Sequence, residues 1–369
     1  MMGREEWGAL KLVRLVAAAV ALLPVLATAQ SVTLYGVIDT GMEYVNNVGS
    51  AKNGVARLMG NTGTVPSRWG LRGTEDLGGG LKSIFVLESG FFPDSGSSSM
   101  GGRLFGRQAF VGLNGAWGQV AFGRQVTMLY WSYLDSDILG ANIFGSSSLD
   151  SYMTFGRADN AVSYKGTFNG LTVGATYSFG RDTVNAGPSP AGTNCAGENP
   201  ADSRTCREWS ALLQYQTAWW GVAAAYDENR GGPGAFGGLV RSNMTDKRAT
   251  ATAYAIFDKA KVGAGVIWRN NDGSSTPRSD LWYVGAAYDI TPAFTLAGQA
   301  YLLRFHDTSN KAWLFALRAS YAFTKRTLVY ATTGYINNRG QSAIAVDGAT
   351  PPPPGVSQLG GMLGIKHVF

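Results

Sequence analysis

The chain has 369 residues and a net charge of +6, with only 15% charged residues, 12% aromatic residues and 50 glycines. Soluble domains typically carry about 25% charged residues and about 7% glycine, so this composition disfavours an ordinary soluble globular protein. The 45% of hydrophobic residues excludes a disordered chain. The balance is typical of a β-protein with many tight turns.

The first 29 residues have the features of an export signal. Arg4, Lys11 and Arg14 supply positive charge, and the stretch "LVRLVAAAVALLPVLATA" ends in the cleavage pattern Ala27–Ala29. A membrane-spanning helix is the alternative, but the apolar run is shorter than the ~20 residues that a span requires. We therefore predict a signal peptide over residues 1–29 and one mature domain over residues 30–369.

Downstream of the signal, long stretches alternate between large apolar and small or polar residues. Segment 171–179, "LTVGATYSF", places leucine, valine, alanine, tyrosine and phenylalanine on one face and threonine, glycine and serine on the other. Segments 31–44, 261–269 and 311–323 alternate in the same way. A period of two over this length predicts β-strands with one apolar face.

The predicted connections between strands alternate strictly between short and long. Short turns are expected near residues 75–80, 114–118, 166–170, 217–221, 258–261, 290–293 and 323–326, and long connections near 47–65, 93–102, 126–156, 181–205, 230–246, 270–279, 306–310 and 337–356. These connections join sixteen strands. Strands can cross a bilayer only as a closed barrel, because every backbone polar group must be paired.

The sequence thus predicts an all-β fold, a 16-stranded antiparallel transmembrane β-barrel whose apolar face points outward. The alternative is a soluble sandwich or barrel with its apolar face inward. It is disfavoured because so many strands share the pattern and so few charges are present.

Cysteine and histidine usage limits the chemistry that the chain can perform. Cys195 and Cys206 are the only cysteines, and in an exported protein such a pair predicts a disulfide. The two histidines, His306 and His367, lie in no recognisable metal or nucleophile motif. We expect no enzymatic activity, no metal or other cofactor, and no nucleic-acid partner.

Four stretches resemble the general trimeric porins of Gram-negative bacteria, especially the β-proteobacterial type. They are "SVTLYGVIDTG" (31–41), "SRWGLRGTEDLGGGLKSIFVLESGF" (67–91), "GRQAFVGLNGAWGQVAFGRQ" (106–125) and "NAVSYKG" (160–166), together with the terminal Phe369. The resemblance implies a homotrimer in the cell outer membrane, among outer-membrane lipid and lipopolysaccharide. It also implies a third loop that folds inward and narrows a channel for ions and small hydrophilic solutes. Phe369 is then expected to be a signal for the barrel assembly machinery.

The resemblance also implies a cationic ladder on the wall of the pore. The family's ladder arginines map onto Arg68, Arg107 and Arg157. Alternation independently places Arg68 on the lumen face of its strand and also gives Glu88 a lumen position. In the alternating pattern Arg124 falls on the lipid-facing side of its strand. Because a charge is disfavoured there, we expect Arg124 at a strand end or beyond a local bulge.

The predicted third loop departs from the family pattern. Many general porins carry Pro-Glu-Phe-Gly-Gly at the loop tip, whereas this chain has "LDSDILGANIFGSSS" over residues 134–148. We expect Asp135 and Asp137 to face the arginines across the pore. The arginine ladder and the positive net charge predict a mild anion preference. A substrate-specific outer-membrane channel for small anionic metabolites is the alternative function.

Overall fold

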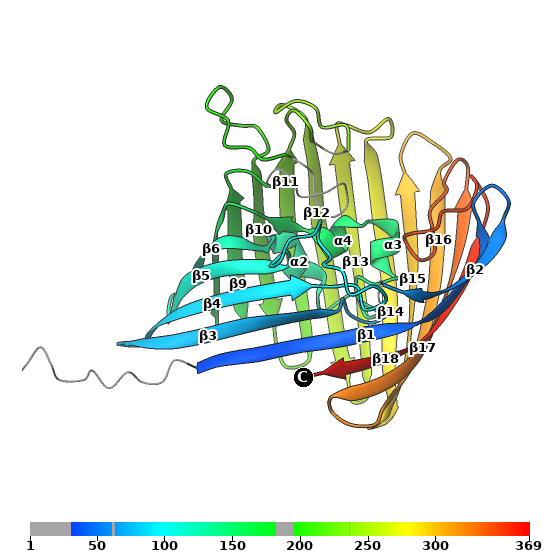
Figure 1. Ribbon diagram of the computed structural model, residues 1–369, viewed down its shortest axis with the longest axis horizontal. Helices are drawn as coiled ribbons and strands as arrows, with labels where there is room; N and C mark the ends of the chain where they lie inside the picture. Colours follow the sequence, from blue (N-terminus) through cyan, green and yellow to red (C-terminus); the bar gives the residue numbers. More distant parts are fainter. Residues whose placement is uncertain (1–30, 61–62, 182–194, 236) are drawn as a thin grey trace, which may run out of the picture.

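The computed structural model describes residues 31–60, 63–181, 195–235 and 237–369, and these form one β-barrel (Figure 1). The predicted signal peptide lies outside the described residues. In the view of Figure 1 most of the long connections lie at the top or upper right of the barrel, and the short turns lie at the bottom or at the left. Among the described residues, no helix combines the length and the apolar character needed to cross a membrane.

The strands follow one another around the barrel in chain order. They are β1 (Ser31–Val48), β2 (Asn53–Met59), β3 (Arg68–Gly78), β4 (Leu81–Gly90), β5 (Gln108–Gly115), β6 (Gly118–Val126), β7 (Arg157–Ala158), β8 (Ala161–Phe168), β9 (Leu171–Ser178), β10 (Glu208–Gln216), β11 (Trp220–Arg230), β12 (Thr245–Phe257), β13 (Ala260–Asn271), β14 (Arg278–Thr291), β15 (Phe294–Phe305), β16 (Lys311–Ala322), β17 (Thr327–Arg339) and β18 (Gln358–Val368).

These eighteen segments make sixteen barrel strands. Segments β2 and β3 both pair with β1, and β7 and β8 both pair with β6, so each couple is one interrupted strand. Strands β1 and β18 close the sheet in antiparallel register, from Val37 opposite Val368 to Val45 opposite Gly360. The predicted 16-stranded antiparallel barrel is therefore confirmed. The one clear difference in the connections is that the stretch 47–65 contains β2.

The alternation predicted for the strands is confirmed in the barrel wall. On β9, Leu171 and Tyr177 are exposed on the outside, whereas Thr172 and Thr176 between them are buried. Outward-facing tryptophans and tyrosines recur on the other strands, as expected for a barrel in contact with lipid.

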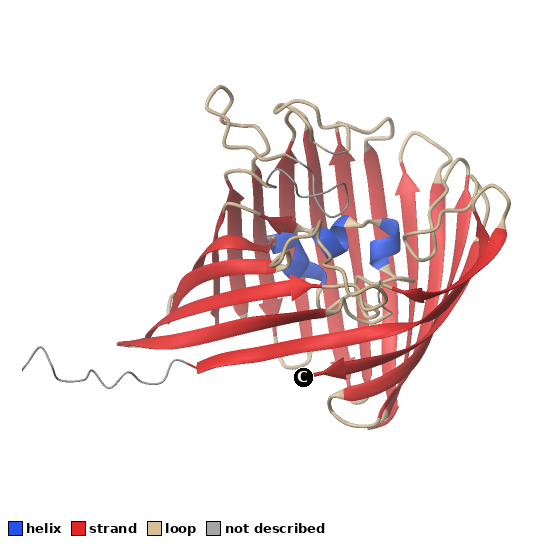
Figure 2. Ribbon diagram, in the orientation of Figure 1, coloured by secondary structure: helices blue, strands red, loops and turns tan. Residues whose placement is uncertain are grey.

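The third long connection, residues 127–156, folds into the barrel and is called loop 3 below. It contains α2 (Met128–Tyr133), α3 (Ser146–Leu149) and α4 (Tyr152–Phe155), which lie inside the ring of strands (Figure 2). Its apolar residues form a core with the inner face of the wall, for example Leu129 and Phe144 with Leu314 and Ile336.

Loop 3 can approach the wall closely because small residues line that part of the lumen. A Cβ atom on Gly263 would lie 2.1 Å from the backbone oxygen of Ser136. A Cβ atom on Gly360 would lie 2.4 Å from the ring of Phe144. Glycine at these positions thus lets loop 3 pack directly onto β13 and β18, and the tight packing holds it there.

Candidate pore constriction

Glu88 on β4 lies between two of the predicted ladder arginines. Its carboxylate accepts a hydrogen bond of 2.7 Å from Nε of Arg107 and lies 3.5 Å from Nε of Arg68. The hydroxyl of Tyr35 donates to the same carboxylate over 3.0 Å. Tyr35 lies on β1, Arg68 begins β3 and Arg107 directly precedes β5, so with β4 four neighbouring strands bring these groups together.

Arg157 at the start of β7 completes the group of ladder arginines. Its Nε atom donates to the backbone oxygen of Arg107 over 2.8 Å, and an Nη atom donates to that of Thr154 over 2.6 Å. Arg157 is only 3% exposed, and the side chains of Arg107 and Arg68 are 8% and 28% exposed. Of the three arginines, Arg68 is thus the one most open to a solute.

Arg124 lies near the extracellular end of β6, two residues before the strand ends. Its guanidinium forms an ion pair with Asp159 and donates to the backbone oxygen of Gly106 over 2.7 Å. The preceding Gly123 has a φ of +126°, a conformation that side chains disfavour. Asp159 follows the short strand β7 and was not predicted, because its partner comes from another strand.

The structure places Asp137 differently from the expectation that it faces the arginines. The side chain of Asp137 is buried between loop 3 and the barrel wall. It accepts hydrogen bonds from Ser146 of the loop (2.6 Å) and from Gln299 (3.0 Å) and Tyr301 (3.2 Å) on β15. Burial raises the pKa of this carboxyl above its usual range, although the three hydrogen bonds oppose the shift. Asp137 therefore fastens loop 3 to β15.

Asp135 also points at the wall behind loop 3. One carboxylate oxygen accepts a hydrogen bond of 2.8 Å from the amide of Gln216 on β10, and the other lies 3.4 Å from Nζ of Lys261 on β13. The Asp135 side chain is 41% exposed, so this pair is open to water.

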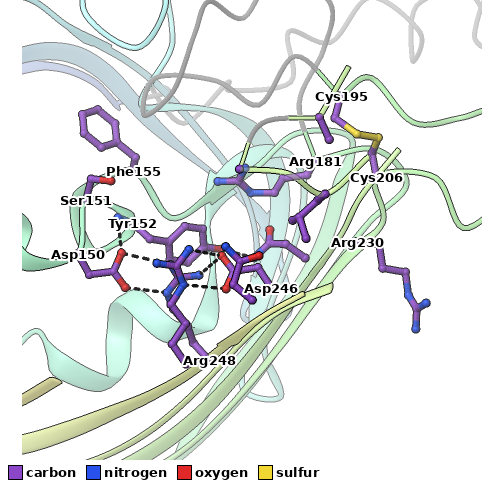
Figure 3. Close-up of a pocket in the computed structure, with 16 residues that line it drawn as sticks. Asp150, Ser151, Tyr152, Phe155, Arg181, Cys195, Cys206, Arg230, Asp246 and Arg248 are labelled. Atoms are coloured by element: carbon purple, nitrogen blue, oxygen red, sulfur yellow. Dashed lines mark hydrogen bonds and ion pairs between the residues drawn. A yellow bond between two sulfur atoms is a disulfide. The ribbon is translucent and has the colours of Figure 1, made fainter. Parts of the chain in front are cut away.

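A third acid of loop 3, Asp150, lies in a charged network that the sequence did not predict (Figure 3). Arg248 on β12 donates two hydrogen bonds of 2.8 and 3.1 Å to the carboxylate of Asp150 and one of 2.9 Å to Asp246. Arg269 on β13 also pairs with Asp246. Burial alone would raise the pKa of Asp150, but the charges of Arg248 and Arg269 outweigh it and hold the pKa at about 2.

The acids of loop 3 and the ladder arginines thus lie on different sides of the loop. Asp135, Asp137 and Asp150 contact strands between β10 and β15, whereas Arg68, Arg107 and Arg157 belong to the sector from β3 to β7. Glu88 is the acid that contacts the ladder, with ion pairs to Arg68 and Arg107.

Cys195 and Cys206 form a disulfide at the extracellular ends of the strands, with their Cα atoms 5.7 Å apart. The backbone of Cys206 accepts from Arg181 and donates to Gly231, each over 2.9 Å. Figure 3 shows the disulfide beside Arg181, above the network of Asp150 and Arg248. The disulfide therefore links two points of the connection before β10, and the backbone hydrogen bonds of Cys206 tie that connection to residues just after β9 and β11.

Phe369 closes the barrel at the other end of the chain. Its backbone exchanges hydrogen bonds of 3.0 and 3.1 Å with Gly36 on β1. Its ring covers Gly36 so closely that a Cβ atom there would lie 2.3 Å from the ring.

Comparison with known proteins identifies the family. A profile of the Gram-negative porin family matches residues 16–341. Outer membrane porin protein 32 of Delftia acidovorans is 29% identical over 92% of this chain and 94% of its own length. An outer membrane porin of Bordetella pertussis is 39% identical, but the match covers 54% of this chain and 54% of that relative, about half its length.

The solved structure of an anion-selective porin from Comamonas acidovorans superimposes on the barrel with a TM-score of 0.71. It is 25% identical in sequence, and the match covers 92% of this chain and all of that porin. The proteins matched are channels rather than enzymes. The chain therefore belongs to the Gram-negative porin family and is a β-barrel of the cell outer membrane.

Proposed function

We propose that the protein is a water-filled channel through which ions and small hydrophilic solutes diffuse passively, with a preference for anions. The constriction lies between loop 3 and the wall sector that carries Arg68, Arg107, Arg157 and Glu88. The observation that carries this proposal is that the acids of loop 3 and the ladder arginines lie on opposite sides of the loop. Its three acids contact the wall behind it and leave the arginines on the other side.

The electrostatics of the four constriction residues favour anions. Three arginines and one glutamate leave a net charge of +2, and arginine stays protonated at any physiological pH. The low-dielectric wall of a barrel focuses the field of such charges into the pore and raises the local concentration of anions. The anion-selective porin from Comamonas acidovorans supports the same preference.

Arg124 has a secondary role in this proposal. It pairs with Asp159 close to the ladder, so we assign it to the rim above the constriction, where it adds little net charge. Asp135 and Asp137 are assigned to the attachment of loop 3.

The selectivity is tested by the zero-current potential of single channels in a KCl gradient across a planar bilayer. We expect anion preference for the unaltered protein, a weaker preference for Arg68→Gln and a stronger one for Glu88→Gln. Lys325→Gln, in the exposed turn 323–326, removes the same charge far from the constriction and is the matched control. Cation preference of the unaltered protein, or equal effects of Arg68→Gln and Lys325→Gln, would refute the proposal.

Solute flux separates this function from a substrate-specific channel. A diffusion channel passes a sugar and a dicarboxylate of equal size with rates that rise linearly with concentration. Saturation of the dicarboxylate flux alone would favour a specific channel for small anionic metabolites.

We further propose that the protein is a homotrimer that contacts outer-membrane lipid and lipopolysaccharide, and that Phe369 is read by the barrel assembly machinery. The hydrogen bonds of Phe369 to β1 support a role in closing the barrel. Native mass spectrometry gives the oligomeric state. Deletion of Phe369 is expected to lower the amount of assembled protein in the outer membrane, and unchanged assembly would contradict its role.

A further inference from the structure

One side of helix α2 in loop 3 is aromatic and faces the pore. The other side of α2 packs on β10, β11 and β12 and carries the buried residues Met128, Leu129, Ser132 and Tyr133. There the backbone of Met128 and the hydroxyl of Ser132 form hydrogen bonds of 2.9 and 2.8 Å with side chains of the wall. Because an α-helix has about 3.6 residues per turn, the half-buried Tyr130 and Trp131 project from the opposite side, into the lumen.

This aromatic face, made of Tyr130 and Trp131, lies close to the ladder arginines. The hydroxyl of Tyr130 is near enough to the guanidinium groups of Arg68 and Arg157 to interact with their charges. The two rings of the face meet edge to face, with their centroids 5.6 Å apart and an interplanar angle of 81°. The aromatic face therefore borders the proposed constriction on the loop side, whereas Arg68 borders it on the wall side.

A lysine adds positive charge beside the aromatic face. Nζ of Lys165 on β8 lies 3.4 Å from the centre of the Trp131 ring, in a cation–π contact. This contact with loop 3 places the side chain of Lys165 on the lumen side of its strand. In the part of the chain that the structure describes, no acid forms an ion pair with Lys165. The loop side of the constriction thus presents aromatic rings together with an uncompensated positive charge.

Rings and cations in one passage suit a solute that combines an aromatic ring with an acid group. A guanidinium can donate two parallel hydrogen bonds to the oxygens of a carboxylate or a sulfonate. A solute ring can make an offset-stacked or edge-to-face contact with tyrosine or tryptophan, which an aliphatic ring of the same size cannot make. An aliphatic anion gains only the first interaction, and a neutral aromatic solute gains only the second.

We propose that the constriction binds small aromatic anions as they pass, with the acid group at Arg68 and the ring against Tyr130 and Trp131. Lys165 adds to the attraction of the anion without choosing between aromatic and aliphatic rings. This inference rests on the proposed function, since it names the class of anion that the channel favours. Passage remains passive, because one aromatic contact contributes a factor of only about two to ten in affinity.

The test compares how well benzenesulfonate and cyclohexanesulfonate block the chloride current of the full protein in planar bilayers. The two probes have the same charge and nearly the same size, and both are strong acids that do not cross the lipid in a neutral form. The recordings are made at low ionic strength, where the fixed charges are least screened. The measured quantity is the ratio of the two half-blocking concentrations.

The variants separate the ring contacts from the charge. Trp131→Leu and Tyr130→Leu each remove one ring, whereas Tyr130→Phe keeps the ring and removes only the hydroxyl. Trp313→Leu is the matched control, because Trp313 alternates on β16 with the buried Ala312 and Leu314 and so faces lipid. Heat-dependent migration on gels and channel conductance check that each variant folds.

We expect benzenesulfonate to block the unaltered protein at about two- to tenfold lower concentration than cyclohexanesulfonate. Trp131→Leu and Tyr130→Leu should each move this ratio toward one, and Tyr130→Phe and Trp313→Leu should leave it unchanged. Lys165→Gln should raise both half-blocking concentrations by the same factor.

Three results would each overturn the inference: equal block of the unaltered protein by both probes, an unchanged ratio in both leucine variants of the aromatic face, or an equal loss in Trp313→Leu. None of these results bears on the preference for anions over cations, which the potential in a KCl gradient measures separately. A channel with anion preference and equal block by both probes would therefore keep the proposed function and remove only its aromatic specificity.

Discussion

Loop 3 should be held in the barrel far more strongly by Asp150 than by Asp135, although both are acids of the same loop. Arg248 is 2% exposed and grips Asp150, which is 11% exposed, through two hydrogen bonds. Asp150→Asn would leave Arg248 buried with only part of its countercharge. Removing one partner of a buried ion pair costs about 3–5 kcal/mol, and we expect the lower end because Asp246 remains beside Arg248.

The pKa of Asp150 gives an independent magnitude. A fall from the usual 3.8 to about 2 corresponds to about 2.5 kcal/mol at 1.36 kcal/mol per pKa unit. Both routes therefore give about 2–3 kcal/mol for the local stability of loop 3. In contrast, the pair of Asp135 and Lys261 is 41% and 34% exposed, and such pairs contribute about 0.2–1 kcal/mol.

The assay is hydrogen–deuterium exchange of peptides from loop 3, measured on the folded protein at neutral pH. We expect exchange through local opening to become about 30- to 150-fold faster in Asp150→Asn and at most about fivefold faster in Asp135→Asn. Peptides from the turn 290–293 serve as an internal reference and should not change. Equal effects of the two substitutions, or no effect of Asp150→Asn, would refute the assignment of the Arg248 network as the main anchor.

Three further predictions follow from the contacts of loop 3. Because the pKa of Asp150 lies below its usual value, its contribution is complete above about pH 4 and is lost as the pH falls toward 2, so the loop 3 exchange, corrected for intrinsic rates, should rise in that window. Asp137→Ala removes the acceptor of three hydrogen bonds and should cost about 1–3 kcal/mol in the same assay, whereas Asp137→Asn keeps one acceptor oxygen and should cost less. Gly263→Ala should shift loop 3 and change the single-channel conductance, because its Cβ would lie 2.1 Å from a backbone oxygen; Gly174→Ala should change it less, since its Cβ meets the flexible end of a methionine, and the opposite order would contradict this packing.

The barrel could be predicted because each strand carries its own signal. In β9 and β16, successive side chains face lipid and lumen in turn, so a period of two is visible without knowledge of any neighbour. The interruption between β2 and β3 could not be predicted in this way. It is held by Asp39, which accepts backbone hydrogen bonds from Thr64 and Val65 over 3.1 and 3.0 Å, and such tertiary contacts leave no local pattern.

For a related reason, the sequence could not predict which way the acidic side chains of loop 3 point. Loop 3 consists of short helical turns and irregular segments, so no fixed period relates neighbouring side chains to a face. Asp137 and its partner Gln299 are 162 residues apart. The residue type showed that negative charge would enter the barrel, and only the fold could show that it meets the wall behind the loop.

The same contacts change what a solute should meet in the pore. If acids faced the ladder, a solute would cross a transverse field between opposite charges. With the acids engaged behind loop 3, Glu88 remains as the acid that contacts the ladder, and its carboxylate is already shared by Arg107, Arg68 and Tyr35. Arg68 is the most exposed of the three ladder arginines, and it also donates to the backbone oxygen of Pro66 over 3.0 Å, which fixes its position. In the proposed constriction we therefore expect a one-sided, positive field, in which Arg68 governs selectivity more than the buried Arg157.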